Sequence, residues 1–89
     1  MKLSIYSIYD TVAQVFNKPF TDINDATATR AFKDSVKDQP HSKDYCLYKL
    51  ADYFDNNGSI QPLENPLKLI SGFETSEEEL PSLVKTQAQ

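Results

Sequence analysis

The sequence predicts a small α+β domain, in which an antiparallel sheet of four or five strands carries one helix on one face. Three observations predict this fold. Residues 45–54 form a strand-like run that leads into the turn sequence Asp-Asn-Asn-Gly. Residues 28–36 carry small and apolar side chains at helical spacing. The chain has 89 residues, enough for one hydrophobic core and too few for two. We assign residues 1–73 to this domain and residues 74–89 to an acidic tail.

Residues 2–9 are predicted to form the first strand, because apolar side chains occur at both alternating sets of positions. A turn at Asp10-Thr11 leads to a second strand over residues 12–16. Pro19 ends this hairpin, because proline cannot donate to a strand ladder. A short helix over residues 10–16 is the alternative, since DTVAQVF begins with a cap residue and spaces its apolar residues at i, i+3 and i+4.

The helix is predicted over residues 24–37. Asn24 or Asp25 can cap the N–H groups of its first turn. Its apolar stripe is narrow and made mostly of small residues, which allows close packing on a sheet: Ala28, Ala31, Phe32, Ser35 and Val36. Pro40 ends the helix, because it disfavours helical geometry in the residue before it.

The run at residues 45–54 is predicted to be the central strand. Alternation divides it into two faces, and we expect Cys46, Leu50 and Phe54 to pack against the helix. The other face would then be open, with Tyr45, Leu47, Lys49, Ala51 and Tyr53 on it. The pair Asn57-Gly58 supplies the two positive φ angles of a tight hairpin turn.

A short return strand follows the turn. Pro62, Asn65 and Pro66 predict an irregular connection, and residues 67–70 a last edge strand that ends at Gly72. Residues 74–89 hold four glutamates and one lysine, with few apolar residues. We predict a mobile tail here, and a short helix that docks on a partner is the alternative.

Charge is unevenly distributed along the chain. The net charge is −4, to which residues 1–73 contribute −1 and the tail −3. A whole-protein field that attracts polyanions is therefore excluded, although a local basic face is compatible with the nearly neutral domain. No apolar run approaches the roughly 18 residues of a membrane span, so we expect no membrane partner. A domain this small would gain stability as a homodimer, which buries further apolar surface.

The residues of an enzyme or metal site are missing. One cysteine and one histidine cannot build a structural zinc site, and Cys46 is expected to be a buried, inert thiol. The single cysteine excludes an internal disulfide, which fits a reducing cytoplasm. Two glycines cannot build a phosphate-cradling loop. We therefore expect no enzyme activity, no metal and no cofactor.

Aromatic and basic residues on one sheet face are typical of single-stranded nucleic-acid binding, in which bases stack on rings and cations meet phosphates. The candidate stacking residues are Tyr6, Tyr45, Tyr48 and Tyr53. The candidate phosphate contacts are Lys2, Arg30, Lys33, Lys37 and Lys49. Half-buried strand tyrosines and solvated lysines would give the same pattern without any binding.

Three segments carry a family resemblance: MKLSIYSIYDTVAQVFNKPF, TRAFKDSV and DYCLYKLADYFDNNGSIQPLENP. In order and spacing they resemble the small non-structural protein of gokushovirus-type microviruses, which are single-stranded DNA phages. The resemblance covers residues 1–66. It implies a non-virion protein of the host cytoplasm that binds single-stranded or replicating viral DNA, and assists the switch to single-stranded DNA synthesis and packaging. It supplies no catalytic residues.

The rival hypothesis is a protein-protein adaptor. Such a protein would engage the replication initiator, the procapsid or a host factor without touching DNA. The net charge of −4 favours this rival, because it opposes association with another polyanion.

Overall fold

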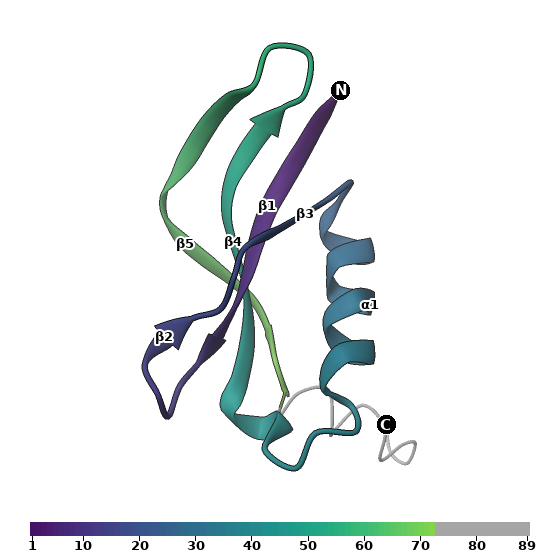
Figure 1. Cartoon of the computed structure of the whole chain (residues 1–89), viewed down its shortest axis with the longest axis vertical. Helices are drawn as coiled ribbons and strands as arrows, with labels where there is room; N and C mark the ends of the chain where they lie inside the picture. The colour runs from purple at the N-terminus through teal and green to yellow at the C-terminus, as the bar shows by residue number, and fades with distance from the viewer. Residues whose placement is uncertain (73–89) are drawn as a thin grey trace, which may run out of the picture.

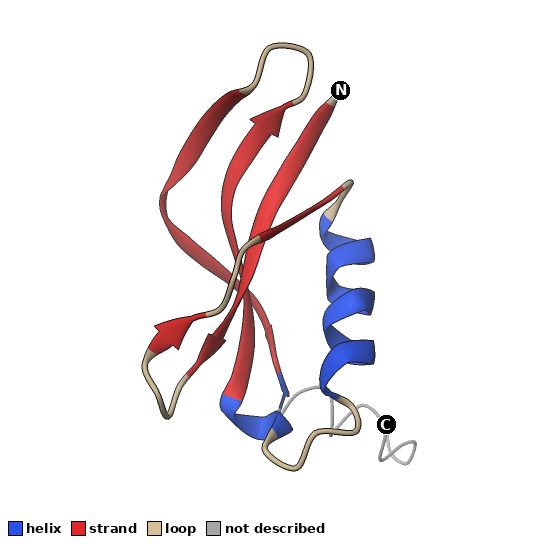
Figure 2. Cartoon of the chain, in the orientation of Figure 1, coloured by secondary structure: helices blue, strands red, loops and turns tan. Residues whose placement is uncertain are grey.

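The computed structural model describes residues 1–72 and contains a twisted antiparallel sheet with one long helix beside it (Figure 1). The strand order is β2-β1-β4-β5, and β3 also pairs with β1. Strands β1 (Lys2–Asp10) and β4 (Tyr45–Phe54) form the centre of the sheet. Strands dominate the fold (Figure 2). The predicted small antiparallel sheet with one helix is confirmed.

The predicted N-terminal hairpin is also confirmed over its helical alternative. Strand β2 (Val15–Phe16) pairs with the end of β1, but it is shorter than expected because residues 11–14 form the turn. Strand β3 (Phe20–Asp22) pairs with the first half of β1. This three-residue strand was not predicted, because so short a segment has no detectable alternation.

Helix α1 (Asp25–Val36) begins as predicted. The side chain of Asn24 accepts a hydrogen bond from the Thr27 N–H at 2.9 Å and so caps the first turn. Ala28, Phe32 and Val36 face the sheet and are buried. Lys37 is the C-cap, its N–H donating to the Lys33 carbonyl, so the helix ends before Pro40. The short 3₁₀ helix η1 (Ser42–Asp44) then leads into β4.

The core lies between α1 and one face of the sheet, and the predicted orientation of β4 is wrong. Leu47, which is fully buried, packs with Phe32 in the core, whereas Leu50 and Phe54 do not belong to this cluster. Neighbouring residues Ile5 and Tyr6 of β1 pair with Ala51 and Lys49, so Leu50 is an extra residue at a bulge. A bulge interrupts the alternation of faces along a strand, which strict alternation over residues 45–54 did not allow for.

Strand β5 (Ser59–Ser71) replaces the predicted irregular connection and separate edge strand. Its pairing with β4 jumps from Pro62 to Leu67, so residues 63–66 bulge away from the ladder while the strand continues. Within the described chain β5 has only β4 as a neighbour, which makes it an edge strand. Proline is tolerated there, because the missing N–H leaves no unpaired ladder partner. The predicted tail, residues 74–89, lies outside the described residues.

The turn between β4 and β5 differs from the predicted tight turn. Phe54 pairs with Ser59, which leaves a four-residue loop. Gly58 has a φ of 77°, and Asn57 is not among the described residues with positive φ. The Gly58 N–H donates to the Phe54 carbonyl at 2.7 Å and closes the loop. The Asn-Gly signal therefore located the turn correctly but gave the wrong turn type.

Candidate nucleic-acid interface

The sheet has two unlike faces. Residues that pair across antiparallel strands point to the same side, so the register assigns each side chain to a face. The helix face packs on α1. The opposite side, which we call the open face, carries no helix in the part of the chain that the structure describes (Figure 2). Its residues are Leu3, Ile5, Ser7, Tyr9, Phe16, Thr21, Cys46, Tyr48, Ala51, Tyr53, Ile60, Pro62, Lys68 and Ser71.

Three rings on the open face form an aromatic cluster, made of Tyr9, Phe16 and Tyr48. The ring centroids of Tyr9 and Phe16 are 4.6 Å apart. Tyr48 meets Tyr9 edge-on at 5.9 Å and Phe16 edge-on at 5.4 Å. These separations and tilts are favourable for aromatic pairs. Phe16 is 43% exposed and the two tyrosines are half-buried, so the cluster holds its rings in place and still presents them to solvent.

The β1–β2 hairpin places Phe16 in this cluster. The Asp10 carboxylate accepts the N–H groups of Val12 and Ala13, at 3.0 and 3.1 Å, and the Gln14 N–H donates to the Asp10 carbonyl. Gln14 adopts a φ of 62°, which reverses the chain and sets Phe16 opposite Tyr9. Local hydrogen bonds of the turn therefore decide the position of the outermost ring.

The base of the cluster is tied to the rest of the sheet. The Ser7 hydroxyl donates to the Asn17 carbonyl at 2.6 Å, and the Asn17 N–H donates to the Ile8 carbonyl at 2.8 Å. Ser7 and Cys46 pair with Tyr48 and Tyr9 and are buried, so the rings form the surface in this region.

Two lysines lie near the aromatic cluster, and the carboxylate of Asp10 is engaged in the adjoining β1–β2 turn. Lys68 pairs with Tyr48 across β4 and β5 and is exposed. Lys18 follows Phe16 by two residues and is also exposed. Among the residues 1–72 that the register assigns to the open face, none is a carboxylate. The local surface is therefore apolar with cationic neighbours, in contrast to the acidic chain as a whole.

Tyr6, a predicted stacking residue, is inside the protein. It is fully buried on the helix face, its ring lies 5.8 Å from that of Phe20, and its hydroxyl donates to Asp25 Oδ1 at 2.7 Å. Burial and the hydrogen bond to Asp25 together raise the pKa of Tyr6 to about 12. Its ring cannot contact a base in this fold, so the prediction of Tyr6 as a stacking residue is wrong.

Lys2 and Lys49 come together on the helix face. Both line a cavity of about 440 Å³ beside the N-terminus of α1. Lys49 Nζ lies 3.8 Å from Asp25 Oδ1 and 3.9 Å from Asp52 Oδ1. Two carboxylates therefore offset the charge of Lys49, which weakens it as a phosphate contact.

The remaining predicted residues divide between the two sides of the molecule. Tyr48 and Tyr53 lie on the open face. Tyr45 packs against the core on the helix face. Arg30, Lys33 and Lys37 project from α1. The structure does not bring the predicted tyrosines and cations together on one surface.

Sequence reasoning left Tyr9, Phe16, Lys18 and Lys68 out of the site. Tyr9 and Phe16 become neighbours only when the hairpin register is known, because they are seven residues apart in the chain. Lys68 joins Tyr48 only through the shifted ladder of β5. The hairpin prediction could have suggested the first pair, and no local signal could have suggested the second.

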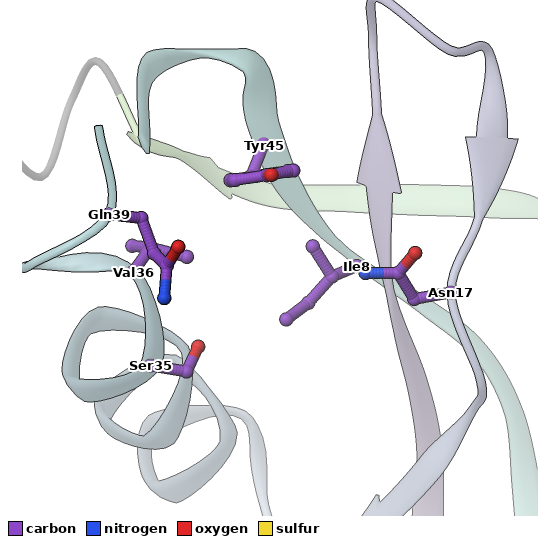
Figure 3. Close-up of a pocket in the computed structure, with 6 residues that line it drawn as sticks. All are labelled: Ile8, Asn17, Ser35, Val36, Gln39 and Tyr45. Carbon is purple, nitrogen blue, oxygen red and sulfur yellow. The ribbon is translucent and has the colours of Figure 1, made fainter. Parts of the chain in front are cut away.

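A groove separates α1 from β1. It consists of two adjoining cavities of about 240 Å³ each, which share Ile8 and Ser35. In Figure 3, Ile8 points from the sheet toward α1, with Tyr45, Gln39 and Val36 around the cavity. Phe20, Ala31 and Phe32 line the second cavity, which is almost wholly apolar. This α1–β1 groove is the second concave feature that a partner could use.

The described residues contain no cluster of three or more histidine, cysteine, aspartate or glutamate side chains able to hold a metal ion. No helix within residues 1–72 combines the length and the apolar character that crossing a membrane requires.

Comparison with models of known protein families gives a match. The family model described as "Phage ORF5 protein" matches residues 3–75, which is most of the chain. A search of curated proteins and a search of solved structures gave no match.

Proposed function

On the premise that this chain belongs to the Phage ORF5 protein family, we propose that it is a non-enzymatic phage protein that binds single-stranded DNA through its open face. Its role is in viral genome replication, at the switch to single-stranded DNA synthesis and packaging, in the host cytoplasm. The sequence resemblance to gokushovirus-type microviruses supports this role. The DNA-binding part of the proposal depends on the geometry of the aromatic cluster.

The observation that carries the proposal is the aromatic cluster of Tyr9, Phe16 and Tyr48. Rings fixed on a sheet and partly exposed can stack unpaired bases, whatever the base sequence. The bases of a duplex are already stacked and paired, so the same surface favours single strands. Tyr53 lies further along this face, opposite Leu3 and Ile60, and offers a second stacking position.

Two cations, Lys18 and Lys68, are the candidate phosphate contacts beside these rings. Few phosphate contacts predict a weak salt dependence: two of them on a single strand give a slope of log K against log salt of about −1.4. Stacking would then supply most of the affinity. This division also fits an acidic protein, because no residue that the register assigns to the open face is a carboxylate.

The test is a titration of fluorescently labelled oligothymidylate, followed by anisotropy at several salt concentrations. We expect Tyr48→Ala and Phe16→Ala each to weaken binding by roughly 1–3 kcal/mol, about 5- to 150-fold. Tyr48→Phe is the matched control, because it keeps the ring and should bind within about twofold of the wild type. Tyr53→Ala tests the second stacking position, with circular dichroism confirming that every variant is folded.

Two results would contradict the proposal. One is unchanged affinity in folded Tyr48→Ala and Phe16→Ala variants, which would remove the cluster from the site. The other is the absence of any complex at low salt with a folded wild-type protein. A slope of log K against log salt much steeper than −2 would indicate more phosphate contacts than the open face offers, and therefore binding at a more basic surface.

The second candidate function is a protein-protein adaptor. The α1–β1 groove favours it, because an apolar groove beside a helix suits an inserted side chain of a partner protein. In this case the partner is the replication initiator, the procapsid or a host factor. A folded protein that binds no DNA, and whose binding to such a partner is lost on Ala31→Glu, would support the adaptor.

A further inference from the structure

Three cations follow the outer surface of α1 at positions i, i+3 and i+7, two of them on the helix and the third at its C-cap. We call Arg30, Lys33 and Lys37 the basic row. Arg30 and Lys37 are exposed, and neither forms an ion pair with a carboxylate of residues 1–72. Asp34, four residues after Arg30 and three before Lys37, is a carboxylate beside the row, and Asp38 lies beyond the end of the helix. The row therefore places three cations against one neighbouring carboxylate of α1.

The basic row faces away from the α1–β1 groove. Ala31 and Ser35 line that groove, and Lys33 lies nearly half a helical turn away from both. The pKa of Asp22 on β3 is lowered by its hydrogen bonds to Thr27 and Ile23 and also by the charge of Arg30, so the N-terminal member of the row is near β3. The basic row therefore lies on the outer side of α1, away from its buried stripe.

The described chain ends near the C-terminal end of α1. Ser71 pairs with Cys46, at the start of β4. Gly72 lies directly against the Ser42 carbonyl, and the Ser42 N–H donates to the Gln39 carbonyl just after α1. Figure 1 shows the end of β5 and the C-terminal end of α1 at the same end of the molecule. The following residues therefore leave from beside the C-terminal end of the basic row.

The residues that follow have the opposite charge. Residues 74–89 contain four glutamates and one lysine. The glutamates are Glu74, Glu77, Glu78 and Glu79. From Gly72 to Glu79 the chain can span up to about 23–25 Å, whereas Lys37 and Arg30 are only about 10 Å apart along the helix axis. Length, point of departure and charge all allow these glutamates to reach the whole basic row.

We propose that the acidic segment of residues 74–89 docks on the basic row of its own chain. Tethering makes this contact intramolecular, so weak single ion pairs can act together at a high effective concentration. The contact covers the cationic side of α1 and leaves the open face as the surface that accepts DNA. The docking itself goes beyond the proposed function and can be measured without DNA.

The experiment compares full-length proteins by NMR in the absence of DNA. In the triple variant Glu77→Gln, Glu78→Gln, Glu79→Gln, we expect the backbone amide signals of the basic row to move, although these residues lie about forty positions away in the chain. Raising the salt concentration of the wild type should shift the same signals in the same direction, because screening weakens exposed ion pairs. Glu64→Gln is the control, because it removes one carboxylate from the bulge of β5. It should leave the amide signals of the basic row unchanged.

A charge exchange gives the decisive result. Arg30→Glu with Lys37→Glu should abolish the salt-dependent shifts, and adding Glu77→Lys, Glu78→Lys and Glu79→Lys to that variant should restore them. Signals of the row that stay unmoved in the triple glutamine variant overturn the docking. Loss of DNA binding in Tyr48→Ala bears only on the open face, so the two proposals fail separately.

Discussion

The Tyr6 hydroxyl donates a 2.7 Å hydrogen bond to Asp25 Oδ1, which joins the middle of β1 to the first turn of α1. The Tyr6 ring is fully buried beside Phe20, so one side chain fills the core and also anchors the helix. Lys49 Nζ approaches the same Asp25 oxygen at 3.8 Å. The N-terminus of α1 is thereby held to the two central strands, and within residues 1–72 no helix covers the open face on the other side.

Removal of this hydroxyl tests its contribution to stability. Tyr6→Phe keeps the ring in the core and should lower the free energy of unfolding by about 1 kcal/mol. The measurement is urea unfolding followed by circular dichroism. The control is Tyr53→Phe, because no hydrogen bond of the Tyr53 hydroxyl occurs within the described residues; its effect should stay within about 0.5 kcal/mol. Equal effects of the two variants would contradict the role of the Asp25 contact.

Alkaline pH should weaken the same contact. The pKa of Tyr6 is raised to about 12 in the fold, from an unfolded value near 10. The stabilisation that accompanies this shift is fully present below pH 10 and is lost as the pH rises from 10 to 12, up to about 2–3 kcal/mol. The test compares urea midpoints of the wild type and Tyr6→Phe across this range. Parallel pH profiles of the two proteins would refute it.

Acidic pH should lower the stability of the fold by protonating Asp22. Its carboxylate accepts the Thr27 hydroxyl at 2.7 Å and the Ile23 N–H at 2.8 Å, and these bonds hold the pKa of Asp22 below its usual value. The stabilisation is present above the unfolded pKa of about 3.9 and is lost as the pH falls through the lower folded pKa. Asp22→Asn should therefore lose less stability on acidification than the wild type. Asp38→Asn is the control, since Asp38 has no hydrogen-bond partner in residues 1–72.

The two glycines should differ in their tolerance of a side chain. A Cβ on Gly72 would overlap the backbone carbonyl of Ser42, which cannot move without distorting η1. Gly72→Ala should therefore cost roughly 2–3 kcal/mol or more. A Cβ on Gly58 meets nothing within 4 Å, but the φ of 77° strains any other residue by about 1 kcal/mol. Urea midpoints that rank Gly58→Ala as the more harmful change would contradict the close contact at Gly72.

Removal of the helix cap should cost about 1 kcal/mol. Asn24→Ala leaves the Thr27 N–H without its side-chain acceptor. Asn56→Ala is a matched change in an exposed turn, where the Asn56 side chain has no hydrogen bond within the described chain. Thermal unfolding should separate the two variants by several degrees. Similar melting temperatures would indicate that solvent satisfies the Thr27 N–H equally well.

Local signals in the sequence determined the elements. Asn24 and Pro40 bracket the helix, the stripe through Ala28 and Phe32 identifies its buried side, and the strand run before Gly58 identifies β4. Each of these effects acts over a few neighbouring residues, so the sequence displays them directly. The family resemblance likewise depends on local motifs, and the family match to a phage protein confirms it at that level.

Only the tertiary structure decided which side chains share a surface. Leu47 faces the helix through its pairing with Ile8, and the bulge at Leu50 reverses the faces of the residues that follow it. The pairing of Tyr9 with Phe16 built the aromatic cluster. Adjacent strand residues point to opposite faces, so one extra residue in a strand exchanges its buried and exposed sets. Such a shift is decided by packing between distant segments, and no local pattern in the chain records it.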